Sequence, residues 1–322
     1  LENAVELDVD CVSDGSRTVV GAILEHVEPA GCHSGDSASV TPPVSLSEEV
    51  LDQIHAYARQ FASALHVCGL MNMQLAVKDG QIYMIEVNPR ASRTIPFVSK
   101  AIGVHLAEVA ALCMIGQRLP EQGFTEEVQL PYYAVKEAVF PFVKFPGVDI
   151  TLTPEMKSTG EVMCIDRDVN IAYLKSQFAA GSRLPASGNV FLSVKDADKA
   201  EAVGLARELA RLGYGLYATR GTATLLWENG LKPIALFRLS EGRPNLLDLI
   251  RDRQISWVIN TTDADTSEAT DGSRMRSGAT AAGIPVTTTI AGAAAAIQGL
   301  AEQQDCGRLE VCSLQEYHRH LP

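Results

Sequence analysis

The segment Tyr83–Arg93, YMIEVNPRASR, contains the residue types of a metal and phosphate site. Residues two positions apart in a strand project from the same face, so Glu86 and Asn88 share a face, and Arg90 follows just beyond them. Their oxygen atoms suit a hard cation such as Mg²⁺ or Mn²⁺, which bridges nucleotide phosphates, and an arginine binds phosphate oxygens through paired donors. The pattern E-x-N-x-R is also common on the solvent face of hairpins, so the pattern by itself leaves a purely structural role open.

The preceding segment Met71–Val77 is predicted to pair with this strand and to supply a third oxygen ligand, Gln74. A two-residue turn between the strands would place Gln74 opposite Ile85, on the wrong face. A three-residue loop, Asp79–Gln81 with its glycine in the left-handed conformation, avoids this. It would pair, across the two strands, Gln74 with Glu86 and Asn72 with Asn88. We therefore predict the three-residue loop.

The first half of the chain reads as an α+β arrangement that would position these residues. Ala4–Val12 alternates cleanly between apolar and acidic residues, which predicts a strand with Glu6, Asp8 and Asp10 on one face. The other predicted elements are a strand over Thr18–Val27, a helix with apolar residues from Val50 to Leu65, a helix over Pro96–Leu112 and a strand over Val135–Pro141.

The second half alternates short apolar strands with amphipathic helices, which predicts a doubly wound parallel sheet covered on both faces. Ala179–Gly188 has the composition of a linker, so we predict two domains, 1–184 and 185–322. The predicted strands are Asn189–Val194, Gly215–Thr219, Pro233–Phe237, Trp257–Thr261, Pro285–Thr288 and Leu309–Ser313.

Small polar residues follow the predicted strands of this second half. In an open parallel sheet, the carboxyl ends of the strands meet at one edge, where backbone N–H groups and hydroxyls can bind an anion. A single Ser or Thr there is usually a helix N-cap, but four such ends favour a shared phosphate site. They are Ser193, Thr219-Arg220-Gly221-Thr222, Asn260-Thr261-Thr262 and Thr287-Thr288-Thr289, with Lys199 and Arg238 as added positive charge.

Composition narrows the class of protein. The formal charge of −12 argues against nucleic acid and anionic membranes as partners, because both would repel the chain. No apolar run reaches the ~18–20 residues that cross a bilayer. The seven cysteines contain no C-x-x-C pair, which is typical of reduced thiols and not of disulfides or a zinc site. We therefore predict a globular, cytoplasmic protein.

Several longer motifs occur in order along the chain. They are MNMQLAV before YMIEVNPRASRTIPFVSKAIGV, HSGDSA at His33–Ala38, KFPGVD at Lys144–Asp149 and STGEVM at Ser158–Met163. Together they resemble the carbamoyl phosphate synthetase large-subunit family over essentially the whole chain. The resemblance implies the C-terminal part of an ATP-grasp domain followed by a methylglyoxal-synthase-like allosteric domain.

The resemblance also implies an activity, the phosphorylation of carbamate by ATP to give carbamoyl phosphate for pyrimidine and arginine biosynthesis. It implies Mg²⁺ or Mn²⁺ as cofactor and leaves K⁺ open. The residues implied to contact ATP are Leu1, Glu6, Gly31, Cys32, His33, Ser34, Gln74 and Glu86, with Gln74, Glu86 and Asn88 on the metals and Arg90 on phosphate as the catalytic residue. By itself, His33 would more often be a capping or core histidine.

In the second half, the resemblance implies binding of a nucleoside monophosphate such as UMP or IMP. The residues implied are Lys199, Thr219, Thr222, Arg238, Asn260, Thr262 and Thr288. Arg238 stands where lysine is frequent, and Asp265 stands where arginine can occur. Free-standing relatives are lyases, but Ser240–Pro244 does not match their catalytic loop, so regulation is the better interpretation. An ornithine site is implied at Glu28, Asp36, Glu137 and Thr287.

The family's ATP site also needs a segment upstream of this sequence, and its large subunit works with a glutaminase small subunit. We expect those two parts, the remainder of the large subunit and the small subunit, as partners. We also expect that the isolated chain does not make carbamoyl phosphate. A regulatory nucleotide-binding module with inert catalytic motifs is the alternative function.

Overall fold

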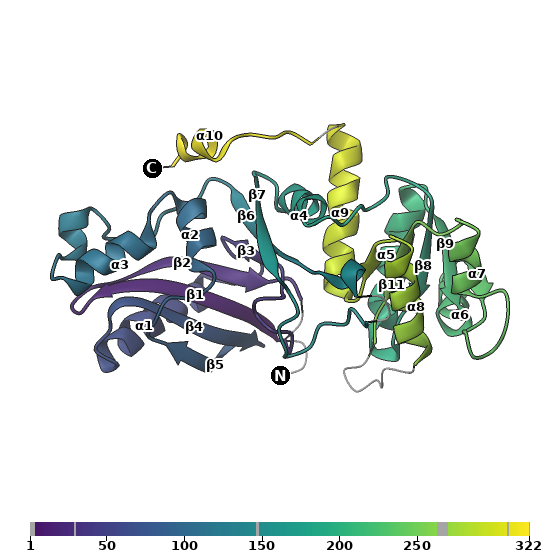
Figure 1. Cartoon of the computed structure of the whole chain (residues 1–322), viewed down its shortest axis with the longest axis horizontal. Coiled ribbons are helices and arrows are strands. Elements are labelled where there is room, and N and C mark those ends of the chain that lie inside the picture. The colour runs from purple at the N-terminus through teal and green to yellow at the C-terminus, as the bar shows by residue number, and fades with distance from the viewer. Residues whose placement is uncertain (1–3, 29, 146–147, 263–269, 308, 322) are drawn as a thin grey trace. The chain divides into compact units, whose positions relative to one another are not determined.

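A computed structural model describes residues 4–28, 30–145, 148–262, 270–307 and 309–321 (Figure 1). The chain forms two compact units. The first comprises Leu1–Glu137, Met163–Ala172 and Leu309–Pro322, and the second comprises Ala138–Val162 and Tyr173–Arg308. The units therefore interleave along the chain, whereas the two predicted domains meet once, at residue 184. That domain boundary stays a prediction.

The first unit is built on an antiparallel sheet whose predicted strands are confirmed. The strand order is β5-β4-β1-β2-β3-β6-β7. The strands are β1 (Val5–Asp14), β2 (Thr18–His26), β3 (Ser39–Thr41), β4 (Cys68–Lys78), β5 (Gln81–Asn88), β6 (Tyr133–Val139) and β7 (Gly160–Asp166). The alternation of β1 therefore sends its acidic residues to one face of the sheet and its apolar residues to the other.

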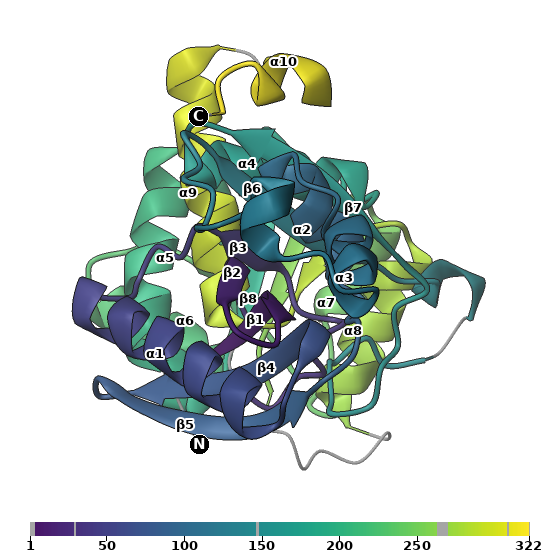
Figure 2. The same ribbon diagram turned by 90° about the vertical axis from the view of Figure 1, so that its left-hand side faces the viewer.

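Helices cover both faces of this sheet. The apolar side chains Leu7, Val9 and Cys11 pack with helix α1 (Glu48–Ala64) in one core. Val12, Ala22 and Leu24 pack with α2 (Ile95–Ile102) and α3 (Leu106–Met114) in another. Figures 1 and 2 show α1 and α2 on opposite sides of β1 and β2. The acidic face of β1 is thus covered by helices over part of its length only.

The prediction of one helix over Pro96–Leu112 was wrong. The chain ends α2 at Gly103, in the left-handed conformation with φ of 71°, and starts α3 three residues later. Among the described residues no single helix has the length and apolar character to cross a membrane, and α2 and α3 meet that test only as a pair bent by 108°. The buried side chains of both helices belong to the core of the first unit.

The hairpin of β4 and β5 differs from the prediction in its turn but not in its pairing. Lys78 pairs with Gln81, so the turn has two residues, Asp79-Gly80, with φ values of 51° and 74°. Positive φ at both positions is typical of a type I′ turn, and the predicted three-residue loop was wrong. Nevertheless, Gln74 pairs with Glu86 and Asn72 pairs with Asn88.

A β-bulge restores the predicted pairing. Leu75 pairs with Met84 while the preceding Gln74 pairs with Glu86, so Ile85 is the extra residue. Because Ile85 has no partner of its own, every residue after it changes face relative to an unbulged hairpin. The bulge therefore pairs Gln74 with Glu86, as the predicted three-residue loop was expected to do.

The second unit contains the predicted doubly wound parallel sheet, with strand order β10-β9-β8-β11-β12. The strands are β8 (Asn189–Ser193), β9 (Gly215–Thr219), β10 (Ile234–Leu236), β11 (Trp257–Asn260) and β12 (Val286–Thr287). The helices are α5 (Lys199–Arg211), α6 (Arg220–Glu228), α7 (Leu246–Arg251), α8 (Asp271–Ala281) and α9 (Ile290–Cys306). Phe191 and Val258 of the sheet share a core with α7 and α8, and α5 packs beside α6 and α9.

The remaining elements are α4 (Val169–Ala179), α10 (Leu314–His318) and the 3₁₀ turns Leu119–Gln122, Phe142–Lys144 and Asp196–Asp198. The strand predicted over Leu309–Ser313 was wrong. Residues 309–313 form no strand, and Ser313 instead caps α10, whose Tyr317 hydroxyl donates to the carbonyl oxygen of Ile165 in the first unit. The tail therefore packs onto the first unit and adds no strand to the parallel sheet.

Candidate functional site

Polar side chains gather on the acidic face of the first sheet in two rows. One row is Asp8, Gln74 and Glu86, and the other is Asp10, Asn72 and Asn88, each running across β1, β4 and β5. Directly opposed residues of antiparallel strands project to the same side of the sheet. The sheet thus brings the three predicted metal ligands to one face, where the Asn88 amide donates to the Glu86 carboxylate at 2.6 Å.

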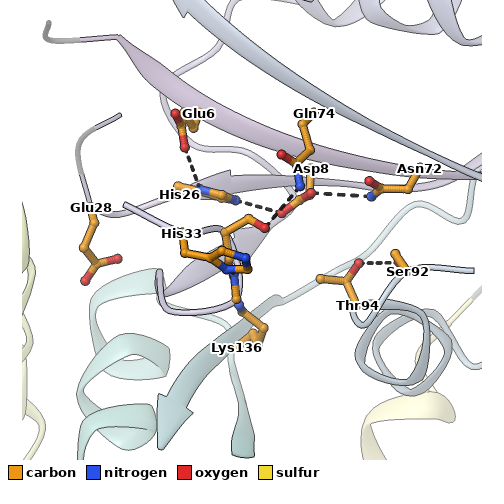
Figure 3. A network of polar contacts seen from close by, with 12 residues as sticks. Glu6, Asp8, His26, Glu28, His33, Asn72, Gln74, Ser92, Thr94 and Lys136 are labelled. Carbon is orange, nitrogen blue, oxygen red and sulfur yellow. Dashed lines mark hydrogen bonds and ion pairs between the residues drawn. The ribbon is translucent and has the colours of Figure 1, made fainter. Parts of the chain in front are cut away.

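A turn after β2 approaches this face and carries other predicted ATP residues (Figure 3). The Gly31 N–H donates to the Glu6 carboxylate at 3.2 Å, and the Gln74 amide donates to the Ser34 hydroxyl at 3.2 Å. His33 accepts the Gly35 N–H through Nδ1 at 3.0 Å. Of the implied ATP contacts, the structure therefore brings together residues of β1, β4 and this turn.

Cys32 and Leu1 are two further residues implied to contact ATP. Cys32 is half-buried, and burial together with nearby acidic groups raises the pKa of its thiol to about 12, so it is a neutral group here. Leu1 lies outside the described residues.

His26 was missed by sequence reasoning, yet it lies among the carboxylates of this face. Its Nε2 lies 2.9 Å from Asp8 Oδ2, and its Nδ1 lies 3.7 Å from Glu6 Oε2. Burial would raise the pKa of Asp8, but the interactions with His26, together with the charge of Lys136 and the hydrogen bond from Asn72, outweigh it, so that the pKa is lowered. The only signal in the sequence was the position of His26 at the end of a predicted strand, which does not say that it faces Asp8.

Lys136 of β6 was missed as well. Its side chain is buried, and its ammonium group donates to the Ser34 carbonyl oxygen at 3.1 Å. Lys136 opposes Ser39 on β3, which in turn opposes His26 on β2, so all three project to the acidic face. This positive charge partly offsets the carboxylates of the face, and only the register of three strands reveals it.

Arg90 follows β5 with an exposed side chain. Its Nη1 donates to the neighbouring carbonyl oxygen of Ala91 at 2.9 Å, and no ion pair to a carboxylate is present among the described residues. An arginine in this state can bind an anion without first breaking a salt bridge.

The residues implied for ornithine divide between the two units. Glu28, Asp36 and Glu137 belong to the first unit, where Asp36 and Glu137 are buried. Glu28 accepts the Ala38 N–H at 2.7 Å, and burial raises the pKa of its carboxyl group. Thr287 belongs to the second unit, where its hydroxyl accepts the Trp257 indole N–H at 3.0 Å.

The second unit has a cavity of about 460 Å³ at the carboxyl ends of β8, β9 and β11. Of the seven residues implied for the nucleotide, Thr219, Arg238, Asn260 and Thr262 line it. The other lining residues are Ser193, Val194, Lys195, Ser240, Thr261, Thr270, Asp271, Gly272, Met275 and Arg276. Three of the four predicted polar strand ends therefore surround one cavity, whereas the fourth, Thr287–Thr289, is not part of its lining.

Three implied nucleotide residues lie outside the lining of this cavity. Thr222 is buried beneath it, with its hydroxyl 3.4 Å from the Thr219 hydroxyl. Lys199 forms an ion pair of 2.6 Å with Asp196 at the start of α5, and Thr288 follows β12. The Asp265 position lies outside the described residues.

Arg276 of α8 is a cavity residue that sequence reasoning missed. Its guanidinium group is fully buried and donates to Asn260 Oδ1 at 2.7 Å and, through Nε, to Asp149 Oδ1 at 2.7 Å. Burial would raise the pKa of Asp149, but the hydrogen bonds and charge of Arg276 hold it at about 2. Asp149 was noticed only as part of the KFPGVD motif, because its partner lies 127 residues away in the chain.

Two family models match the chain. Residues 1–122 match the carbamoyl-phosphate synthase L chain ATP binding domain, and residues 201–288 match the MGS-like domain. All of the chain aligns at 51% identity with 30% of the carbamoyl phosphate synthase large chain of Pasteurella multocida. The chain belongs to the carbamoyl phosphate synthase large-chain family. The resemblance predicted from the motifs is thereby confirmed.

The chain spans about a third of the length of the large chains that it matches, for example 30% of the Pasteurella multocida protein. The carbamoyl phosphate synthase large chain, C-terminal section, of Methanocaldococcus jannaschii is 47% identical over 98% of this chain and 53% of its own length. The predicted fold, the C-terminal part of an ATP-grasp domain followed by an MGS-like domain with a parallel sheet, is confirmed.

Among solved structures, the biotin carboxylase domain of a single-chain bacterial carboxylase is 20% identical to this chain. The alignment covers 57% of this chain and 48% of that domain's chain, with a TM-score of 0.46.

Proposed function

We propose that the first unit supplies one wall of an ATP site at which carbamate is phosphorylated to carbamoyl phosphate. The observation that carries this proposal is the row of Gln74 and Glu86 on the same sheet face as Asn88, beside the turn that bears His33 and Ser34. The relatives are named carbamoyl phosphate synthase large chains, which supports this reaction over that of another ATP-grasp ligase. Arg90 would then bind a phosphate group.

The donor set fits a hard divalent cation. Glu86 offers a carboxylate, and Gln74 and Asn88 each offer an amide oxygen, because their nitrogens already donate to Ser34 and Glu86. Oxygen ligands of this kind suit Mg²⁺ or Mn²⁺, and K⁺ would be a further cation of the site. When bound, the divalent cation would neutralise phosphate charge, and the protein's own residues would position ATP and exclude water.

The second unit would bind a nucleoside monophosphate such as UMP or IMP as an effector. Its cavity of about 460 Å³ has the size of a small-ligand pocket, ~300–1,000 Å³. Hydroxyls of Thr219 and Thr262 would bind phosphate oxygens, with positive charge from Arg238. Ornithine would be a second effector, its amino groups held by the acidic Glu28, Asp36 and Glu137 of the first unit.

In the intact protein, the remainder of the large chain would complete the ATP site, and a glutaminase small subunit would supply ammonia. The enzyme would then be a glutamine-hydrolysing carbamoyl phosphate synthase in the cytoplasm, serving pyrimidine and arginine biosynthesis. The isolated chain would bind effectors but would not make carbamoyl phosphate.

Isothermal calorimetry of the purified chain with UMP, IMP, ornithine and Mg-ATP tests this proposal, together with an assay for carbamoyl phosphate from ATP and carbamate. The proposal expects effector binding, and product formation only with the remainder of the large chain present. Nucleoside monophosphate binding without any turnover in the intact protein would instead favour a regulatory module with inert catalytic motifs. The cavity of the second unit supports that alternative as well, since it does not depend on the ATP site.

A further inference from the structure

Asp10 is a buried carboxylate that the proposed reaction does not use. It is fully buried on β1, two residues beyond Asp8 in the same acidic face. Its Oδ1 accepts hydrogen bonds from the Ser92 hydroxyl at 2.7 Å and from the Asn72 amide at 3.0 Å. Its Oδ2 accepts a further hydrogen bond from the Thr94 hydroxyl. Asp10 thus contacts the loop that follows β5 at two places.

That loop is the segment Asn88–Thr94, and it carries the predicted phosphate ligand Arg90. Its beginning is fixed where Asn88 pairs with Asn72 on β4. Its end is fixed at Thr94, the residue that precedes α2 and whose side chain makes no capping bond to that helix. The Thr94 hydroxyl is instead committed to Asp10 and to Ser92, whose hydroxyl lies 2.8 Å away.

The loop lies close to the turn that carries His33. Arg93 Nη1 would lie only 3.3 Å from a Cβ atom placed on Gly35, so a larger residue there would press on the arginine. A shift of the loop would therefore displace both the strand that bears Asn88 and the turn that bears His33. The contacts of Asp10 with Ser92 and Thr94 hold the last three residues of this loop.

The chemistry of the cluster matches an anchoring role. A carboxylate only accepts hydrogen bonds, and all three of its neighbours here have a donor to offer. Burial raises the pKa of Asp10 to about 6, although the three hydrogen bonds act in the opposite direction. A buried charge of this kind is costly, and satisfied hydrogen bonds are what makes it tolerable in a core. A hydrophobic residue would fill the same space but would leave two hydroxyls of the loop without an acceptor.

We propose that Asp10 is a positioning residue for the phosphate-transfer site. It holds the loop Asn88–Thr94 through the Ser92 and Thr94 hydroxyls, so that Asn88 and Arg90 project from a fixed backbone. This inference rests on the proposed function. It adds a residue that touches neither the nucleotide nor the metal, and whose effect on the reaction passes entirely through the loop.

The test compares Asp10→Asn with Asp14→Asn in the intact large chain with its partner subunit. Asp14 is a matched control, because it is also a buried carboxylate of β1 that accepts hydrogen bonds from neighbouring segments, through the N–H groups of Arg17 and Leu119. Those two segments, the turn between β1 and β2 and the start of the 3₁₀ turn Leu119–Gln122, carry none of the predicted site residues. Steady-state kinetics gives kcat and KM for ATP, and hydrogen exchange reports the amides of residues 88–94.

We expect Asp10→Asn to lower kcat by roughly tenfold to a hundredfold while KM for ATP changes by less than about threefold, because the loop is misplaced but ATP still meets Glu86 and Gln74. Exchange of amides 88–94 should rise at least about tenfold. Asp14→Asn should leave both readouts within about twofold. The double variant Ser92→Ala with Thr94→Val should reproduce the loss in kcat, and adding Asp10→Asn to it should add little further loss.

Equal effects of Asp10→Asn and Asp14→Asn on kcat would overturn the inference, and so would unchanged exchange of residues 88–94 in Asp10→Asn. If the unmodified intact protein failed to phosphorylate carbamate, the proposed function would be wrong. The exchange measurement would still decide whether Asp10 holds the loop, so the two failures are distinguishable. Urea unfolding of each variant separates a general loss of stability from a local one.

Discussion

At the scale of single residues, the acidic face of the first sheet poses an electrostatic problem. Glu6, Asp8, Asp10 and Glu86 carry their charge on a protein whose formal charge is already −12, and ATP is a polyanion. Three groups lessen the repulsion, namely His26 beside Asp8, Lys136 beneath Ser34 and Arg90 after β5. A cation bound at Glu86 would offset the remaining repulsion between the carboxylates and ATP, because two unit charges about 4 Å apart interact by roughly 4 kcal/mol near a protein surface.

The first prediction concerns Glu86. Glu86→Gln removes the only carboxylate among the three predicted ligands while keeping its shape, so it should weaken Mn²⁺ binding at least about tenfold in the presence of ATP. Electron paramagnetic resonance of free Mn²⁺ measures this affinity. Gln81→Glu, on the same strand and exposed, is the control and should have little effect. Unchanged Mn²⁺ affinity in Glu86→Gln would show that the cation is held elsewhere.

At the scale of elements, the hairpin of β4 and β5 shows how side-chain parity is decided. The alternation of β4 correctly indicates that Gln74 belongs with Glu86, but it does not say how the chain achieves this. A longer loop and a bulge are equivalent solutions, since each adds one residue between the paired positions. The chain uses a two-residue turn, where Asp79 and Gly80 both have positive φ, and adds the extra residue at Ile85.

The second prediction follows from this equivalence. Deleting Ile85 removes the bulge and leaves Gln74 opposite Glu86, so Mn²⁺ affinity should stay within about threefold of the original. Deleting Val87 is the matched control. It also shortens β5 by one residue, but it moves Asn88 to the opposite face and should weaken Mn²⁺ binding at least about tenfold. Equal losses in the two deletions would contradict the assignment of Ile85 as the bulge.

The third prediction concerns the ion pair of α8 with the segment that precedes β7. Asp149→Asn leaves the buried Arg276 charge without its partner and should destabilise the second unit by about 3 kcal/mol at neutral pH. The folded pKa of Asp149 is about 2, below the ordinary value of 3.8. A lowered pKa of an acid contributes stability above the unfolded value, and that contribution is lost as the pH falls from 3.8 toward about 2.

Urea unfolding followed by tryptophan fluorescence measures this effect, because both tryptophans, Trp227 and Trp257, lie in the second unit. The difference between Asp149→Asn and the original protein should shrink as the pH approaches about 2. Asp252→Asn, a surface change on the same unit, should show no such trend. A difference that stays constant with pH would indicate that Asp149 acts by packing and not by charge.

At the scale of the whole molecule, the two units are expected to respond to different ligands. The fourth prediction is that UMP stabilises the second unit, because a ligand that binds only the folded state adds about 2.7 kcal/mol at a hundredfold excess over its Kd. Thermal unfolding followed by tryptophan fluorescence should show the shift with UMP. Arg238→Ala should abolish most of it, whereas Arg251→Ala on α7, which does not line the cavity, should not. The absence of any shift with UMP or IMP would refute a nucleotide site in this cavity.

The sequence by itself determined the features that depend on near neighbours along the chain. The alternation of Glu6, Asp8 and Asp10 predicted an acidic face, and the repeated strand and helix pattern predicted the parallel sheet, three of whose four predicted polar strand ends share a cavity. Periodicity carries this information because a strand repeats every two residues and a helix every 3.6. The motifs likewise identified the family.

Only the tertiary structure decided which distant residues meet. The bulge at Ile85, the location of His26 beside Asp8, the anchoring of Ser92 and Thr94 by Asp10, and the pairing of Arg276 with Asp149 all depend on strand register and helix placement. Asp10 and Ser92 are 82 positions apart in the chain, and Asp149 and Arg276 are 127 positions apart. No periodicity relates residues at such separations, so the sequence pattern does not predict these contacts. Buried polar groups find whichever partner the packed fold brings to them, and for Asp10 that partner is the loop that carries Arg90.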